Sequence, residues 1–183
     1  MNVPASPDDR LSALALAIVE KNEKQARDVI AAGVPLTGKR LPLPAPVGVP
    51  SNWFEDGLPP LVWVVSRMLD LVRGSHDPEP YAIGGLAAQF GLPAQAQART
   101  YPEEISQSLE TLAQIGGELL LAGASVEVRM GRTARAQKAV DALGVYLPEY
   151  ATSMRAAANQ RMLNALIKNR PRPTEDETYR RRM

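Results

Sequence analysis

The pattern of apolar residues near the start of the chain predicts two short helices joined by a tight turn. Ser6 and Pro7 suit a helix start, because serine caps free backbone N–H groups and proline fits the first helical position. The first helix is expected to end near Asn22, with Leu11, Leu14 and Ile18 on one face. A second helix, about 23–32, buries Ala26, Val29 and Ile30, and Gly33 fits the left-handed residue that closes many helices.

The same 3.6-residue spacing recurs along the rest of the chain. It predicts helices over 61–72, 102–122, 132–143 and about 148–168, with a weaker helical pattern over 81–90. The capping-box pattern at Thr100 to Glu103 marks the start of the longest apolar stripe. Gly116 and Gly117 within that helix predict a kink or a point of close packing. Because no strand pattern is convincing, the sequence predicts an all-α fold.

Proline-rich and charged stretches divide the chain into one helical domain and its appendages. We expect a single helical domain over 1–168, interrupted by a Pro-rich loop over 37–60 and by an insertion over 74–100. Alternating prolines forbid a helix in that loop and favour a stiff connecting segment. The segment 169–183 loses the apolar stripe and ends in Arg180, Arg181 and Arg182. This tail is either solvated or an arm that docks on an acidic partner or a neighbouring subunit.

Composition narrows the possible function classes. The chain has 183 residues, 45% of them hydrophobic, and a net charge of +1, which gives no bulk attraction to nucleic acid or to an anionic membrane. The absence of cysteine excludes disulfides and cysteine-based zinc sites. The first ten residues lack a signal-peptide pattern, and no apolar run is long enough to span a membrane. We therefore expect a cytoplasmic protein, or alternatively a component of a virion or another large assembly.

Three fragments of the chain resemble ankyrin repeats, whose units pair two antiparallel helices with a projecting loop. The first runs from Leu14 to Val34, through the turn at Lys21-Asn22 to the ending at Gly33. The second opens at Asp56 to Leu61, and its ending appears only at Leu119 to Val126. The third opens at Gly131 to Ala134 without the usual Pro-Leu-His core. The resemblance implies about two to three degenerate stacked units, one with an insertion of roughly 40 residues. An irregular α-helical bundle is the alternative fold.

Each motif that could support catalysis or cofactor binding lacks a required residue or the required geometry. Gly33 to Lys39 matches a phosphate-binding loop for seven places, but Arg40 stands where a Ser or Thr must bind magnesium. Ser75, His76 and Asp77 are adjacent, so they cannot form the chain of hydrogen bonds of a hydrolase triad. Because His76 is the sole histidine, a multi-histidine metal site is excluded. The sequence therefore predicts no enzyme activity, no cofactor and no metal.

Two groups of residues are candidates for binding a protein partner. Trp53 and Phe54, with Asp56 beside them, form an aromatic pair that would project next to an ankyrin-like binding surface, where exposed tryptophans are typical hot spots. The alternative is that the pair folds back over the core; Trp63 is expected to be core. A basic cluster near the third loop is either a solvated face or a site for an acidic partner; its members are Arg129, Arg132, Arg135 and Lys138.

These observations favour a non-catalytic protein–protein interaction module that uses projecting loops and one helical face. A structural subunit of a larger assembly is an alternative, with the Pro-rich arm and the Arg-rich tail joining homo- or hetero-oligomers. A small inhibitor or immunity protein is a third possibility, compatible with the size and the lack of a catalytic set.

Overall fold

The chain forms seven helices in the part that the computed structural model describes, which covers residues 6–41, 44–74, 101–131 and 136–168. In this part β-structure is limited to one isolated antiparallel bridge between Arg129 and Lys138. The all-α prediction is confirmed. The helices are α1 (Pro7–Glu20), α2 (Glu23–Ala31), α3 (Ser51–Glu55), α4 (Pro60–Gly74), α6 (Glu103–Ala122), α7 (Ala139–Tyr146) and α8 (Pro148–Lys168).

The first two helices form for the local reasons that the sequence predicts. The Ser6 side chain accepts a hydrogen bond from the Asp9 backbone N–H at 3.1 Å and caps α1. Lys21 takes a left-handed conformation, with φ of 56°, and ends α1 slightly before the expected boundary. The Asn22 side chain then accepts from the Gln25 N–H and caps α2. Gly33 follows with φ of 86°, the left-handed conformation predicted for it.

The predicted helix over 132–143 has the wrong boundaries. Met130 N–H donates to the Gln137 carbonyl at 3.0 Å, and Ala139 N–H donates to the Val128 carbonyl at 2.8 Å. These hydrogen bonds join two segments of the same chain and engage backbone groups as far as Ala139. The helix α7 therefore begins only at Ala139. At its other end, the helix continues through Gly144 to Tyr146 instead of closing at 143–145. Pro148 then opens α8, and a residue before proline avoids helical backbone.

A short helix, α3, interrupts the loop predicted over 37–60. Five residues are too few for a stable isolated helix, so tertiary contacts must hold it. Its Trp53 and Phe54 side chains are buried, and both contact Trp63 of α4. Burial of these aromatic side chains therefore explains why a helix forms in a proline-rich segment.

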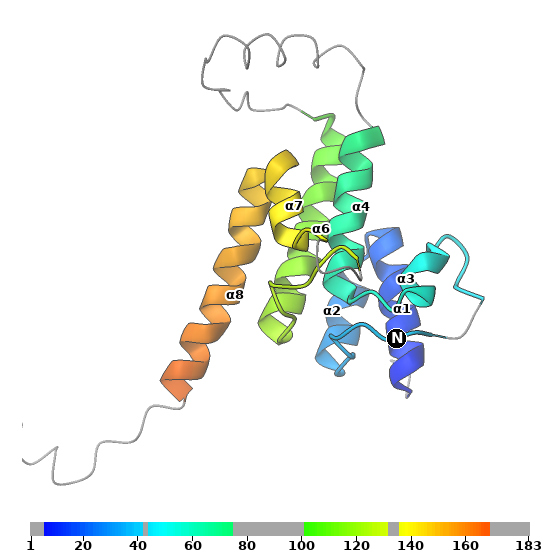
Figure 1. Cartoon of the computed structure of the whole chain (residues 1–183), viewed down its shortest axis with the longest axis horizontal. Coiled ribbons are helices and arrows are strands. Elements are labelled where there is room, and N and C mark those ends of the chain that lie inside the picture. The colour runs from blue at the N-terminus through cyan, green and yellow to red at the C-terminus, as the bar shows by residue number, and fades with distance from the viewer. Residues whose placement is uncertain (1–5, 42–43, 75–100, 132–135, 169–183) are drawn as a thin grey trace, which may run out of the picture.

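The six longer helices are arranged as three pairs in two rows (Figure 1). The pairs are α1 with α2, α4 with α6, and α7 with α8. The first helices contact one another along one row, α1 with α4 and α4 with α7. The second helices do so along the other row, α2 with α6 and α6 with α8. The apolar stripe of each helix therefore packs against neighbours in its own pair and in the next.

A single apolar core runs through all three pairs. It contains the residues expected from the helical periodicity of α1, α4 and α6, and no polar or charged residue of the described chain is buried in it. Its largest fully buried side chains are Trp63, Phe54, Leu11, Leu14, Ile18, Leu61, Met68, Leu109, Leu112, Ile115, Leu119 and Leu120. Trp63 is thus a core residue, as predicted.

The last helix, α8, packs only along its first half. Ala151 and Met154 are buried against the core, whereas every residue from 159 to 168 is exposed. In Figure 1 the second half of α8, drawn in orange, extends away from α6. None of the helices in the described residues is long and apolar enough to cross a membrane.

Candidate functional site

Between α6 and α7, residues 123–131 and 136–138 form two arms that pair with each other and position one side of the candidate site; we call these two arms the hairpin. Gly123 ends α6 with φ of 125°, and the Arg129–Lys138 bridge closes the hairpin. The Arg129 guanidinium donates to the Ala136 carbonyl at 2.7 Å and ties the two arms together. Because α7 starts directly after the second arm, the hairpin sits against the beginning of α7.

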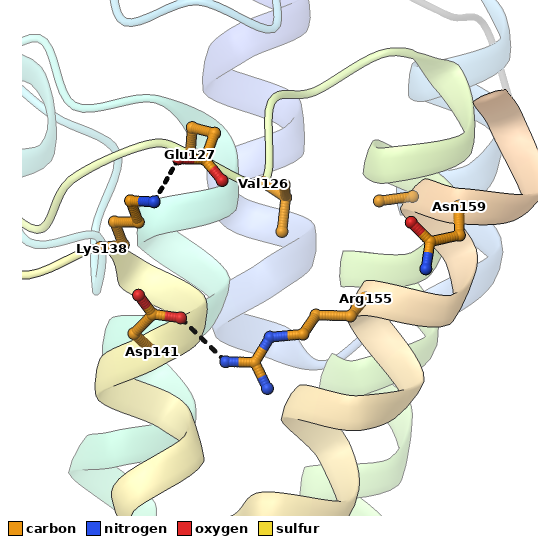
Figure 2. A pocket seen from close by; sticks show the side chains of 7 residues that line it. Val126, Glu127, Lys138, Asp141, Arg155 and Asn159 are labelled. Atoms are coloured by element: carbon orange, nitrogen blue, oxygen red, sulfur yellow. Dashed lines mark hydrogen bonds and ion pairs between the residues drawn. The ribbon is translucent and has the colours of Figure 1, made fainter.

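A groove of about 230 Å³ lies where this hairpin meets α7 and α8. Figure 2 shows its charged side chains, which come from three elements: the hairpin, the first turn of α7 and the middle of α8. The lining residues are Val126, Glu127, Lys138, Asp141, Arg155, Ala158 and Asn159. The groove therefore offers two cations, two carboxylates and one amide over a small apolar floor.

Two ion pairs organise the charges of the groove. Lys138 pairs with Glu127 across the two arms of the hairpin, and the Arg155 guanidinium donates to the Asp141 carboxylate at 2.8 Å. Asp141 lies in the first turn of α7, where the helix dipole favours a carboxylate. The Arg155 and Asp141 side chains are each about half exposed. Exposed pairs contribute ~0–1 kcal/mol, so a partner's charged groups can replace either member at little cost.

A second, wider hollow lies between α6 and α8 and has an acidic lining. Glu110, Gln114 and Gly117 come from α6, and Glu149 and Tyr150 from α8. Burial raises the pKa of the Tyr150 hydroxyl above its usual value, and the charges of Glu149 and Glu110 raise this pKa further. The hydroxyl therefore stays protonated at neutral pH and can donate a hydrogen bond. The residues that line this hollow include no cation, so it cannot pair with a partner's carboxylates as the groove can.

The prediction that Trp53 and Phe54 are exposed interface anchors is wrong. Trp53 is 3% exposed and Phe54 is 1% exposed. The Trp53 and Trp63 rings stack in parallel with centroids 5.4 Å apart, and Phe54 meets Trp63 edge-on at 5.7 Å. Burying these two aromatic side chains in the core stabilises the fold more than exposing them at a loop tip would. The alternative interpretation, that the pair folds back over the core, is confirmed.

Of the other predicted site residues, the structure describes some and leaves others outside the described ranges. Asp56 is exposed at the end of α3, and Arg129 is exposed on the hairpin beside the groove without lining it. Arg132 and Arg135 lie outside the described residues, and so do Arg180, Arg181 and Arg182. Of the insertion predicted over 74–100, only Gly74 is described, as the last residue of α4.

The segment that matches part of a phosphate-binding loop does not have the local structure of one. The segment from Gly33 to Lys39 follows a helix and runs into a loop, and the Lys39 ammonium pairs with Asp8 at 2.6 Å. A phosphate-binding loop instead connects a strand to a helix. Within the described ranges, no three His, Cys, Asp or Glu side chains gather closely enough to hold a metal ion. His76 lies outside those ranges.

Comparison with known proteins does not assign the chain to a group. No protein-family model matches it, and searches of curated proteins and of solved structures found no match.

Sequence reasoning found only one of the charged groove residues, Lys138, and missed its partners. Glu127 and Lys138 would have been found if the hairpin had been recognised, because opposite charges then face each other across its arms. Asp141 and Arg155 lie on different helices, and no local pattern relates them. Only the packing of α7 on α8 brings the two side chains together.

Proposed function

We propose that this chain is a non-catalytic protein-binding module built from ankyrin-like stacked helix pairs, and that it binds its partner through the groove at the hairpin. The proposal is supported first by the arrangement of the helices. Three consecutive pairs stack through two parallel rows of contacts, which is the way repeat proteins bury a continuous core.

The loops between the pairs give a second line of support. The two arms of the hairpin lie between the second pair and the third along the chain. The loop between the first two pairs also returns on itself, because Gly38 lies so close to the Gly57 carbonyl oxygen that a Cβ atom built on Gly38 would collide with it. Such returning loops between helix pairs are the part of an ankyrin-like array that projects toward a partner.

The single observation that carries the binding proposal is the chemistry of the groove. Its four charged side chains are exposed and weakly paired, so they are available for exchange with a partner's charges. Its described lining carries no hydroxyl, thiol or imidazole, and its lysine and carboxylates are exposed and held in ion pairs rather than placed as nucleophiles. Reversible recognition of a mixed-charge protein segment is the function that this set of groups supports best.

Quantitative affinity capture from a lysate of the source cells tests the proposal. The baits are the intact chain, an Arg155→Ala variant and an Arg27→Ala control. Arg27 also sits in exposed ion pairs, with Glu23 and Glu118, but lies on α2 and outside the groove lining. We expect Arg155→Ala to reduce capture of the partner about 10-fold or more and Arg27→Ala to leave capture unchanged. Equal capture by all three baits would show that the groove is not the binding surface.

A further inference from the structure

The outer face of the second half of α8 carries a row of exposed apolar side chains. We call Met162, Leu163, Leu166 and Ile167 the outer stripe; they are 64%, 53%, 68% and 72% exposed. A contiguous exposed apolar patch on a helix marks an interaction surface more often than scattered single residues do.

The outer stripe is centred on the side of α8 that points away from the core. Ala151, Met154 and Ala158 recur at helical spacing and pack on the core. A step of 100° per residue places Leu163 directly opposite Met154, and Ile167 and Leu166 about 140° and 120° round the helix from it. Met162 lies on the flank of the stripe, about 80° from Met154. A helix with apolar residues on both sides is expected to be covered on both sides, and within the described residues the outer side has no cover.

The two ends of the stacked array differ in their chemistry. The first pair exposes charged side chains, among them Glu20, Lys24 and Asp28, and no large apolar side chain of α1 or α2 is exposed. The last pair exposes the outer stripe instead. Terminal units of a stacked helical array need a polar outer face to stay apart in water. The first pair has that property and α8 lacks it.

The outer stripe also carries no charge that would repel an identical stripe. The charged residues of the second half of α8 are Arg161 and Lys168, seven residues apart and so on one face. The Arg161 guanidinium lies beside the end of α6, since a Cβ atom built on Gly123 would be 3.2 Å from its Nη2 atom. Both cations therefore stay clear of the stripe.

We infer that the outer stripe binds the same stripe of a second copy of this chain, with the two α8 helices antiparallel about a two-fold axis. In such an interface each copy presents the same patch, so an uncharged apolar stripe is complementary to itself. Residues 169–183 are a poor alternative cover, because this segment contains no Leu, Ile or Val, and its apolar residues are limited to Pro171, Pro173, Tyr179 and Met183. Four side chains per copy make an interface smaller than most stable ones, so the dimer dissociates on dilution.

Sedimentation velocity over about 1 to 500 μM chain tests this inference. The intact chain is compared with Leu163→Glu, Leu166→Glu and the control Asn164→Glu, which adds the same charge to the same turn away from the stripe. We expect a concentration-dependent dimer for the intact chain and for Asn164→Glu. Each leucine substitution should weaken dimerisation at least ~10-fold, because it buries an unpaired carboxylate. Circular dichroism checks that every variant keeps its helix content.

Two results would overturn the inference. One is an intact chain that stays monomeric over the whole range, which would leave the stripe to a different protein or to another segment of this chain. The other is a dimer that persists unchanged in Leu163→Glu and Leu166→Glu, which would place the interface elsewhere. Partner capture through the groove is scored separately with Arg155→Ala, which leaves the stripe intact, so failure of one proposal does not imply failure of the other.

Discussion

Trp53 shows how a single residue can be misjudged from its neighbours in the sequence. It follows a run of prolines and precedes an Asp-Gly turn, a context that suggests an exposed loop tip. Hydrophobic burial outweighs this local preference, because the Trp53 side chain removes a large apolar area from water when it stacks on Trp63. With few aromatic residues in the chain, this cluster of three is the main anchor of the first inter-pair loop.

We therefore expect Trp53→Ala to lower the free energy of unfolding by ~3–5 kcal/mol, the usual effect of removing a buried large aromatic side chain. Urea denaturation followed by circular dichroism measures this change. Val47→Ala is the matched control in the same loop, because Val47 is 96% exposed and its truncation should change stability by less than ~0.5 kcal/mol. A Trp53→Ala variant as stable as the intact chain would contradict the burial described above.

At the scale of helices, the contact between α6 and α8 depends on a glycine. A Cβ atom on Gly116 would lie 2.6 Å from the Met154 Cε atom, whereas one on Gly117 would meet no atom within 4 Å. The Gly-Gly pair was predicted to be either a kink or a close-packing point. The helix runs unbroken from Glu103 to Ala122, so Gly116 serves close packing.

The two glycines offer an internal comparison. Gly116→Leu should destabilise the fold by ~1–3 kcal/mol, because the larger side chain forces α8 away from α6. Gly117→Leu should be neutral or stabilising by up to ~1 kcal/mol, because it relieves the low helix propensity of glycine without a clash. Chemical denaturation of the two variants measures the difference, and equal stabilities would show that α6 and α8 do not pack closely at Gly116.

At the scale of the whole molecule, stability is expected to be uneven along the stacked pairs. The second pair has neighbours on both sides, whereas α8 has one neighbouring row and an exposed second half. Local opening requires least free energy where few apolar contacts must break.

Hydrogen exchange measured by mass spectrometry on dilute chain tests this expectation. Backbone amides of residues 159–168 should exchange at least ~10-fold faster than those of residues 109–120 in α6, because the former lack packing against the core. Comparable protection of the two segments in dilute solution would mean that a part of the chain covers the outer side of α8.

The sequence by itself determined the helical class and most helix boundaries. Glycine stops and 3.6-residue periodicity are local signals, so α1, α2, α4, α6 and α8 begin and end close to where they predict. Side-chain caps are seen for α1 and α2, whereas the N-cap of α6 is Pro102 with no side-chain cap bond, so the predicted capping box at the start of α6 is wrong. The predictions of a cytoplasmic location, a protein partner and an Arg-rich docking tail remain predictions.

Tertiary structure alone decided the features that depend on contacts between distant segments. The burial of Trp53, the late start of α7, the Asp141–Arg155 pair and the unpacked second half of α8 all belong to this group. The physical reason is the same in each case: the gain in free energy comes from removing apolar surface from water, or from pairing groups, between residues that no sequence spacing relates. Periodicity identifies which side of a helix is apolar, and only packing shows which apolar side remains uncovered.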